Sequence, residues 1–447
     1  MASAQLTRTP SSASNRRTWT WSAWVKRSSL STGNQVLFEG IQGGFPEKLQ
    51  FTSGDYLEYD HDIAGTDYTV YTTRLFRDVN AWYHIMWVKD TTQATETDRI
   101  KLYVNGEQQT LTEHQLGYPG QNYEGAINNN VTHYIGANNG SEYFDGQMAH
   151  VNFVDGTALA PAAFGEADTT TGIWRPKVSP SVTYSTNGFF LKMDNAANMG
   201  LDSGGGSNNF TTGGTIIQTK DTPSNVFATL NPLNVPTSNA PTFANVNNTS
   251  TTPGSSGRFG GTSTLGMSAG KYYWEAKYVI SGLPRGEFGV SYDPGEQARN
   301  NSTASNYADA WCYQSEGGHI RNNNSNLDQE ATYTNGDIVM CALDLTNNKI
   351  YFGKNGTWVN SGDPTSGASG TGAYSVTADK TYFTITSDNT SGSDQQTYQF
   401  NFGNGYFGTT AVSSAQNPDD GNGIFEYDVP AGYRALCTKS LNAQEYS

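Results

Sequence analysis

The stretch from Gly336 to Trp358 has the most regular alternation of residue types in the chain. Residues two positions apart share one face of an extended strand, and the apolar side chains here are typical of a sandwich strand packed on at least one side. Asn347-Asn348 comes next, and asparagine tolerates the positive φ of a tight hairpin. Ile350 and Phe352 return along the partner strand. The pattern therefore predicts a hairpin that the rest of its domain surrounds.

Similar period-two segments, separated by Gly and Asn corners, recur along the chain. In the first part they lie at 18–27, 35–41, 48–62, 81–90, 99–108 and 133–159. In the second part they lie at 270–280, 287–293, 380–388 and 397–407. Many short strands with turn signals between them are typical of antiparallel sandwiches. The predicted fold class is all-β, with two antiparallel β-sandwich (jelly-roll) domains in tandem.

The composition agrees with many short strands joined by turns. The chain has 447 residues, which is too long for one ordinary sandwich and sufficient for two. It contains 49 Gly, 12% aromatic residues and only 15% charged residues. The aromatic content argues against disorder. Cys312, Cys341 and Cys437 are odd in number and far apart, so they predict neither a disulfide framework nor a CxxC metal site.

The net charge of −15 disfavours nucleic acid and anionic membranes as partners, because both attract basic surfaces. No run of about 18 apolar residues is present, so we expect no membrane insertion. Residues 1–17 contain Arg8, Arg16 and Arg17 and no acidic residue. They predict a polar N-terminal arm, either flexible or anchoring the protein in a larger assembly. Deleting such an arm should leave a folded protein.

The order of motifs in the first domain resembles a known family. The phrases SAWVKR, AWYHIMWVKD, IKLYVNGEQ and YFDGQMAHVNFVDGTAL follow one another as the strands do in laminin-G-like or concanavalin-A-like jelly rolls. With the closing phrase AFGEADTTTGIWRPK, the chain looks most like virion proteins of marine tailed bacteriophages. The resemblance covers roughly residues 15–180, and we place this domain at 18–180.

Residues 181–265 are rich in Gly, Ser, Asn, Thr and Pro, and we interpret them as a connector packed on both neighbouring domains. After them, GKYYWE, EFGVSYD, GDIVMCALDL, IYFGKNG and QFNFGNGYF resemble, in order, a SPRY (B30.2-like) domain. We place that domain, with its C-terminal tail, at 266–441. Both families usually bind rather than catalyse.

The resemblance to concanavalin-like folds, which include glucanases, requires a search for paired carboxylates. Those enzymes carry Glu-x-Asp-x-Glu on one strand, so that the acids share a face. Glu58-Tyr-Asp60-His-Asp62 has this spacing but ends in the shorter Asp. We interpret it as a solvated strand face, with Leu57 and Tyr59 pointing inward. We predict no catalytic residue and no enzyme activity.

The sequence also predicts no metal centre or cofactor. The six histidines show no HxH or HxxxH spacing. Laminin-G-like folds sometimes hold calcium through loop carboxylates. A structural calcium ion at Asp145, Asp155 and Asp202 would need these residues to meet in the fold.

Aromatic residues in polar loops are the best indication of binding, because sugar rings stack on Tyr and Trp. The loop at 305–326 contains Tyr307, Trp311, Tyr313 and Arg321. The loop at 117–125 contains Tyr118 and Tyr123. The alternative interpretation is that these aromatic residues pack against a neighbouring domain or subunit.

Taken together, the features predict a bacteriophage virion protein on the particle surface, assembled in the bacterial cytoplasm. The predicted role is a tail fibre or host-contact protein that binds cell-surface glycans, with other virion proteins as partners and a homo-oligomeric state. The first alternative is a capsid decoration or head-fibre protein with an architectural role. The second alternative is a polysaccharide depolymerase.

Overall fold

The computed structural model describes residues 3–62, 66–254, 258–389 and 393–445. The chain divides into two compact units, Met1–Gln218 and Thr219–Ser447. Each unit contains two main β-sheets and its own hydrophobic core. The predicted all-β fold with two antiparallel sandwiches in tandem is therefore confirmed.

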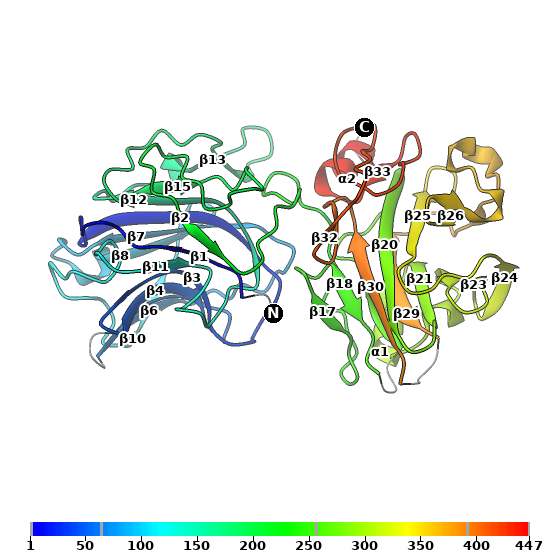
Figure 1. Ribbon diagram of the computed structural model, residues 1–447, viewed down its shortest axis with the longest axis horizontal. Coiled ribbons are helices and arrows are strands. Elements are labelled where there is room, and N and C mark those ends of the chain that lie inside the picture. The colour runs from blue at the N-terminus through cyan, green and yellow to red at the C-terminus, as the bar shows by residue number, and fades with distance from the viewer. Residues whose placement is uncertain (1–2, 63–65, 255–257, 390–392, 446–447) are drawn as a thin grey trace. The chain divides into compact units, whose positions relative to one another are not determined.

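The first unit is a sandwich of an eight-stranded and a six-stranded sheet (Figure 1). In spatial order the larger sheet contains β10 (Leu111–Gln115), β6 (Asp67–Thr72), β5 (Leu57–Asp62), β4 (Phe45–Phe51), β3 (Gln35–Gln42), β11 (His133–Ile135), β1 (Gln5–Arg8) and β16 (Thr211–Gly213). The smaller sheet contains β15 (Phe189–Leu191), β12 (Gly146–Asp155), β2 (Thr18–Arg27), β7 (Tyr83–Asp90), β8 (Ile100–Val104) and β9 (Glu107–Gln108). Two 3-10 turns, Glu96–Asp98 and Pro161–Ala163, lie in the connections.

Aromatic side chains fill the space between these sheets. Trp19, Trp21 and Trp87 are fully buried, and Phe38 stacks near Trp21 with ring centroids 6.3 Å apart. β2 is buried on both faces. On the outer side of this sheet, the hairpin of β13 (Gly165–Ala167) and β14 (Trp174–Pro176) places Trp174 against His84 of the neighbouring strand β7. The closing phrase of the first domain therefore has a packing role.

The described part of residues 1–17, from residue 3 onward, belongs to the first sandwich. β1 pairs with β11 on one side and with β16 on the other, and Leu6 is 2% exposed. The structure differs here from the predicted arm because Leu6 completes the apolar inner face of the sheet. Residues 181–218 likewise contribute β15 and β16 to the first unit.

The second unit has a nine-stranded and a six-stranded sheet. The larger sheet contains β17 (Thr242–Ala244), β18 (Thr249–Thr251), β30 (Gln395–Asn401), β20 (Lys271–Ser281), β25 (Ile338–Asp344), β26 (Lys349–Lys354) and β27 (Thr357–Trp358), with β28 (Tyr374–Ser375) on β26 and β33 (Arg434–Ala435) on β20. The smaller sheet contains β19 (Phe259–Thr262), β29 (Phe383–Asp388), β21 (Gly286–Ser291), β22 (Ala310–Gln314), β23 (His319–Asn322) and β24 (Ser325–Gln329).

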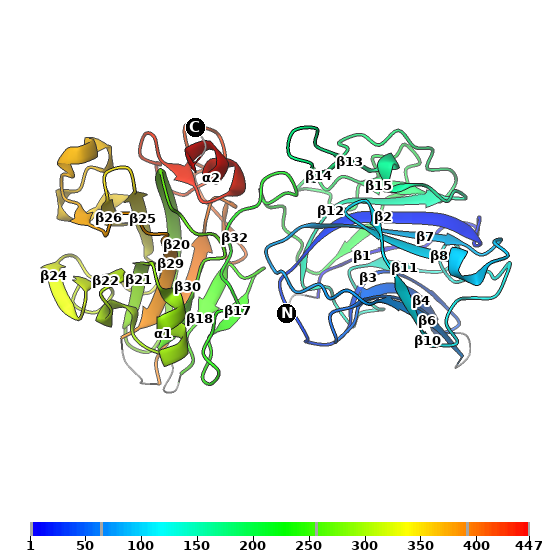
Figure 2. The same ribbon diagram turned by 180° about the vertical axis from the view of Figure 1, so that it is seen from behind.

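Short elements complete the second unit. They are the hairpin of β31 (Tyr406–Phe407) and β32 (Thr410–Ala411), the helices α1 (Pro294–Asn300) and α2 (Thr438–Glu445), and the 3-10 turns Ala304–Asn306, Val359–Ser361 and Pro364–Ser369. The helices lie at opposite ends of this unit (Figure 2). Residues 219–265 contribute β17, β18 and β19 to its two sheets. The stretch for which a connector was expected therefore contributes short strands to the sheets of both units.

The hairpin predicted around Asn347-Asn348 is confirmed. β25 and β26 pair antiparallel, with Cys341 opposite Phe352. Asn348 has a φ of 54°, as the tight turn requires. One face of β25 packs into the main core of the unit, and the other face enters a second, smaller core.

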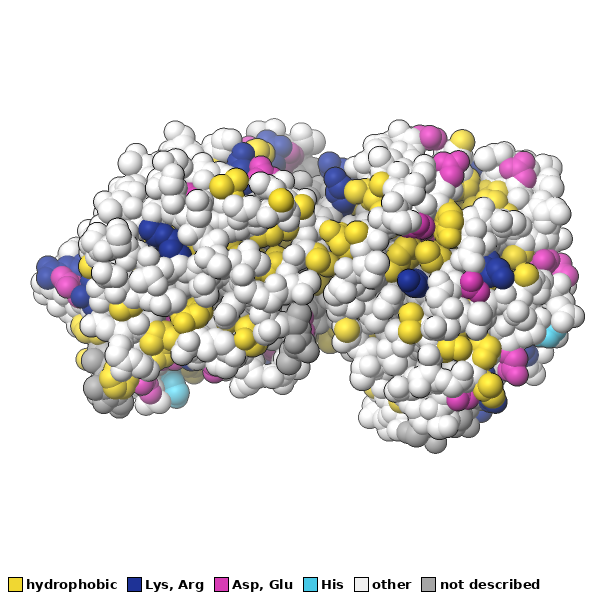
Figure 3. Space-filling model, viewed as in Figure 1, with side chains coloured by type: hydrophobic (Ala, Val, Ile, Leu, Met, Phe, Trp, Pro, Cys, Tyr) yellow, Lys and Arg dark blue, Asp and Glu magenta, His cyan; other side chains and the backbone are white. Residues whose placement is uncertain are grey.

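That smaller core lies on the outer face of the nine-stranded sheet, beneath the C-terminal segment. Tyr273 and Met340 contact this segment through Phe425 and Tyr433. Hydrophobic side chains also gather at the surface over β20 and β25 (Figure 3). Among the residues that the structure describes, no helix has the length and apolarity to cross a bilayer.

Candidate functional site

Two of the aromatic residues predicted to bind in the second unit belong to its core. Trp311 and Tyr313 lie in β22, where they are 6% and 0% exposed. The expectation that they are exposed in a loop is wrong. Their alternation around Cys312 is that of a strand, and this signal was present in the sequence.

The other two residues of that set remain near the surface. Tyr307 is half-buried, and its hydroxyl oxygen accepts a hydrogen bond from Asn300 Nδ2 at 3.0 Å. Arg321 Nη2 donates to Asn324 Oδ1 at 2.8 Å. Each side chain is thus held by a neighbouring asparagine, and their role in binding stays a prediction.

Tyr118 and Tyr123 of the first unit have different environments. Tyr118 is 8% exposed and belongs to the main core. Tyr123 is half-buried, with its ring centroid 5.1 Å from that of His61. Lys89 Nζ lies 5.7 Å from the Tyr123 ring, so this ring covers a buried ion pair.

The buried ion pair joins the two sheets of the first unit. Lys89 Nζ on β7 lies 2.5 Å from Glu47 Oε1 on β4, and both side chains are 0% exposed. Tyr59 Oη and the Ile127 amide also donate to this carboxylate, at 2.7 Å each. Burial raises the pKa of Glu47, but Lys89, His61 and the hydrogen bond from the Ile127 amide together lower it to about 2. Gly125 lies against the pair. A Cβ at this position would lie 1.9 Å from a Glu47 oxygen, so the close approach requires glycine.

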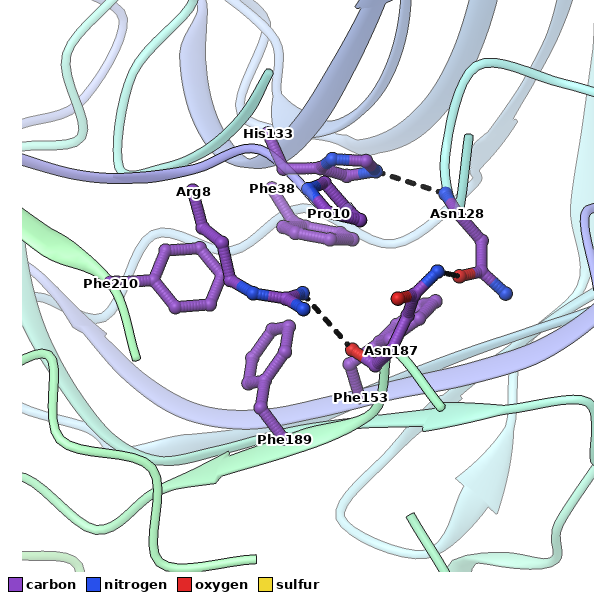
Figure 4. A pocket seen from close by; sticks show the side chains of 9 residues that line it. All are labelled: Arg8, Pro10, Phe38, Asn128, His133, Phe153, Asn187, Phe189 and Phe210. Carbon is purple, nitrogen blue, oxygen red and sulfur yellow. Dashed lines mark hydrogen bonds between the residues drawn. The ribbon is translucent and has the colours of Figure 1, made fainter. Parts of the chain in front are cut away.

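Arg8 lines a small cavity in the first unit (Figure 4). Its guanidinium donates to the Asn187 carbonyl oxygen at 3.3 Å and to Asn208 Oδ1. Asn187 Nδ2 in turn donates to Asn128 Oδ1 at 2.9 Å. The cavity encloses about 10 Å³, room for one water molecule. Arg8 is therefore a structural residue of the sandwich, and this cavity is too small for a ligand.

Arg16 and Arg17 lie closer to the surface and share one acidic partner. Arg16 Nη1 and Arg17 Nη2 lie 3.4 and 3.0 Å from the carboxylate of Glu124. Arg16 Nε also donates to the Gly125 carbonyl oxygen at 2.7 Å. These contacts hold residues 16–17 against the loop that carries Tyr123.

A serine and a histidine in the first unit have the spacing of a catalytic pair. Ser22 Oγ lies 2.8 Å from His84 Nε2. Trp174 Nε1 donates to His84 Nδ1 at 3.0 Å, so the ring proton is on Nε2 and points at Ser22. Burial lowers the pKa of His84 to about 3, which keeps the ring neutral. A base must accept the serine proton, and this histidine donates instead, so the pair is structural.

The outer face of the eight-stranded sheet carries two rows of polar and aromatic side chains, which we call the polar face. The strand register places each row side by side across neighbouring strands. The first row is Tyr134, Glu39, Lys48, Asp60, Thr69 and His114, and the second is Gln50, Glu58, Tyr71 and Thr112. Tyr56 and Glu142 adjoin these rows.

Three neighbouring rings form an aromatic group on the polar face. The centroid of Tyr71 lies 5.3 Å from that of Tyr56 and 6.1 Å from that of His114. Tyr56 and Tyr71 are half-buried and His114 is exposed. Glu58 is the cross-strand neighbour of Tyr71 and accepts a hydrogen bond from Gln50 at 2.6 Å. Exposed rings beside hydrogen-bonding groups are the combination that sugar recognition uses.

The acidic side chains of the polar face have perturbed ionisation. Burial raises the pKa of Glu39 to about 8, although Lys48 partly opposes this. Burial also raises the pKa of Glu58 and of Asp60, and each has a further acidic neighbour. Lys48 Nζ lies 3.5 Å from Asp60 and 3.3 Å from Glu142. Clusters of perturbed groups are common at functional sites, which makes this face the strongest candidate site of the chain.

The segment Glu58-Tyr-Asp60-His-Asp62 has the predicted orientation. Leu57 and Tyr59 are fully buried in the core, whereas Glu58 and Asp60 point outward. Sequence reasoning identified these two acids but missed Glu39, Lys48 and Tyr71. The polar residues that alternate with apolar ones at 39, 48 and 50 were a signal for this second face.

The carboxylates named for a calcium site each have another partner. Asp145 accepts from Ser28 Oγ at 2.8 Å, Asp155 from Asn128 Nδ2 at 2.6 Å, and Asp202 from the Phe190 amide at 2.9 Å. In the parts of the chain that the structure describes, no group of three His, Cys, Asp or Glu residues is arranged to hold a metal ion.

The two units define a tandem of β-sandwich domains of the binding type, and family comparison agrees. Residues 2–163 match the family model of the concanavalin A-like lectin/glucanases superfamily. Residues 271–405 match the SPRY domain. The chain therefore contains a laminin-G/concanavalin A-like domain followed by a SPRY domain, and domains of these kinds generally bind glycans or proteins.

Solved structures are similar to parts of the chain at low identity. The SPRY domain of human HERC1 is 20% identical, with 34% of this chain and 86% of that chain covered and a TM-score of 0.28. The TRIM65 PSpry domain is 14% identical, with 38% and 91% covered and a TM-score of 0.29. A native heptameric SAP-like pentraxin from Limulus polyphemus is 16% identical, with 35% and 71% covered and a TM-score of 0.26.

Proposed function

We propose that the protein is a bacteriophage virion component on the particle surface that contacts the host by binding cell-surface glycans through the polar face of its first unit. The aromatic group Tyr56, Tyr71 and His114 beside Glu58 and Gln50 carries this proposal. The family matches support a binding role, and the motif order resembling phage virion proteins supports the location.

The geometry explains how such a face would hold a sugar. The C–H face of a pyranose stacks on a tyrosine ring, while carboxylate and amide groups take up hydroxyl hydrogen bonds. A single shallow site of this kind is weak. Several copies on one particle raise the avidity by orders of magnitude, so a homo-oligomer attached to other virion proteins suits this role.

A glycan array probed with the full-length chain tests the proposal. Binding to host glycans is expected, and Tyr71→Ala should weaken it at least tenfold by removing the stacking surface. Tyr307→Ala tests the other candidate location, in the second unit, and should leave binding intact if the polar face is the site. If Tyr307→Ala abolishes binding and Tyr71→Ala does not, the site lies in the second unit. The absence of binding to any glycan would favour the architectural role of a capsid decoration or head-fibre protein.

Polysaccharide hydrolysis is the second candidate function, because Glu58 and Asp60 point outward from one strand and burial raises the pKa of both, as in a general acid. Incubating the protein with β-glucans and bacterial polysaccharides and measuring released reducing ends tests it. Turnover that Glu58→Gln abolishes would establish a depolymerase. A purified protein that binds the same polysaccharide without releasing ends supports binding alone.

A further inference from the structure

Negative charge dominates the polar face. Glu58, Asp60 and Glu142 contribute three carboxylates, Glu39 keeps its proton near neutral pH because burial raises its pKa to about 8, and Lys48 is the one ammonium in the two rows and the residues adjoining them. Glu58 and Asp60 lie on β5, and Glu58 is the cross-strand neighbour of Tyr71. A ligand stacked on that ring would therefore lie next to carboxylates.

Lys48 cannot serve an anionic ligand. Its ammonium is held by Asp60 at 3.5 Å and by Glu142 at 3.3 Å, and its side chain is only 9% exposed. Asn138 Nδ2 also donates to Glu142 Oε2 at 2.6 Å, which fixes that carboxylate near the lysine. An arriving anion would have to displace one of these partners to reach the charge.

Glu39 adds an independent observation at the same place. It is 0% exposed, and the Asn139 backbone amide donates a hydrogen bond to its carboxyl group. It faces Lys48 across the strand pair and interacts electrostatically with Asp60 and Glu142. A buried acid with so few polar partners is costly for stability, and acids with perturbed pKa values of this kind are common at functional sites.

We propose that the polar face selects glycans without negative charge, and that Glu58 and Asp60 are the residues that exclude acidic sugars. This inference rests on the proposed glycan-binding function. Like charges about 5 to 8 Å apart at a partly buried surface repel enough to weaken binding roughly tenfold per charge. Uronic acids, sulfated sugars and sialic acids would be rejected, and neutral sugars would be accepted.

The test compares neutral oligosaccharides with their sulfated or uronic acid counterparts on one array, using the full-length chain. We expect the anionic member of each pair to bind at least tenfold more weakly. The difference should shrink between about 0.05 and 0.5 M salt, because salt screens the repulsion. The salt series uses the unaltered protein, so it does not depend on a variant that folds.

The Glu58→Gln/Asp60→Asn variant should shrink the ratio of neutral to anionic binding about tenfold, whatever its affinity for the neutral sugar. Glu107→Gln, on exposed β9 of the other sheet, is the control and should leave the ratio unchanged. Equal binding of neutral and anionic sugars by the unaltered protein would overturn the selectivity while leaving glycan binding in place. Failure to bind sugars of either kind would overturn both.

Discussion

At the scale of single residues, Glu39 links the polar face to stability. Its native pKa of about 8 lies above its ordinary value of 4.5, so the proton stabilises the folded state. That contribution is complete below about pH 4.5 and is lost as the pH rises through 8. The Glu39→Gln side chain has no ionisable proton. At pH 9 the free energy of unfolding of this variant should therefore be about 2 kcal/mol higher than that of the unaltered protein, whereas at pH 4.5 the two should differ little.

Urea unfolding at the two pH values measures this effect. Glu107→Gln is exposed and should show no pH-dependent difference. Identical pH profiles for Glu39→Gln and the unaltered protein would mean that Glu39 is ionised in the native state.

At the ion pair between Lys89 and Glu47 the charged form of the acid is the stabilising one, in contrast to Glu39. Lys89→Met leaves a buried carboxylate without its cation and should lower the free energy of unfolding by about 3–5 kcal/mol. Adding Glu47→Gln should recover much of the loss, since the amide oxygen can still accept from the Ile127 amide while the NH2 group donates to the Tyr59 hydroxyl. Denaturant titration of the two variants checks this, and equal losses in both would show that the charge is irrelevant.

The pH dependence of this pair also has a definite sign. The pKa of Glu47 is depressed to about 2, so its contribution is present above about pH 4.5 and is lost as the pH falls through 2. As the pH falls, the free energy of unfolding of the first unit should therefore decrease less steeply in the double variant than in the unaltered protein.

At the scale of elements, strand β1 determines how deletion of the N-terminal residues affects the stability of the first unit. Deleting residues 1–17 removes β1 from between β11 and β16 and removes Arg8 from its hydrogen-bonded cavity. Loss of Leu6 alone costs about 2–3 kcal/mol. We expect a melting temperature at least roughly 5 °C lower, measured by circular dichroism.

The matched control deletes only the first four residues, which lie before β1. An unchanged melting temperature after deletion of residues 1–17 would show that the polar arm expected from the sequence is correct and that β1 contributes nothing to stability.

Strands whose two faces differ clearly were predictable, and strands that depend on distant partners were not. The pattern at 338–354 specified β25, its turn and β26, because the turn residues adjoin both strands. By contrast, β1 and β16 contain three or four residues each and pair with segments far away in sequence. No local pattern reveals such a partner.

The candidate site divides in the same way. Glu58 and Asp60 were visible because they alternate on one strand. Their proximity to Lys48 and Glu39 depends on the register of three strands, which the sequence does not specify. The aromatic residues at 311 and 313 were assigned to a loop because the surrounding Ser, Asn and Gly residues obscured a five-residue strand.

At the scale of the whole molecule, the unit boundaries predict which fragments fold. Fragments 1–218 and 219–447 each contain a complete pair of sheets and should be soluble, with cooperative unfolding. Fragment 266–441 lacks β18 and β19, which pair with β30 and β29, and should be aggregated or molten. Circular dichroism and analytical ultracentrifugation of the three fragments provide the comparison. A stable 266–441 fragment would show that residues 219–265 are dispensable.

The position of β1 also has a consequence during synthesis on the ribosome. Leu6 leaves the exit tunnel long before its partner Thr212, which is translated 206 residues later (212 minus 6). At about 5–20 residues per second, strand β1 waits roughly 10–40 s for the strand that covers its free edge. The larger sheet of the first sandwich is therefore completed only when β16, the last of its strands to be translated, emerges. Until then the growing chain presents an unpaired strand to chaperones or to neighbouring nascent chains.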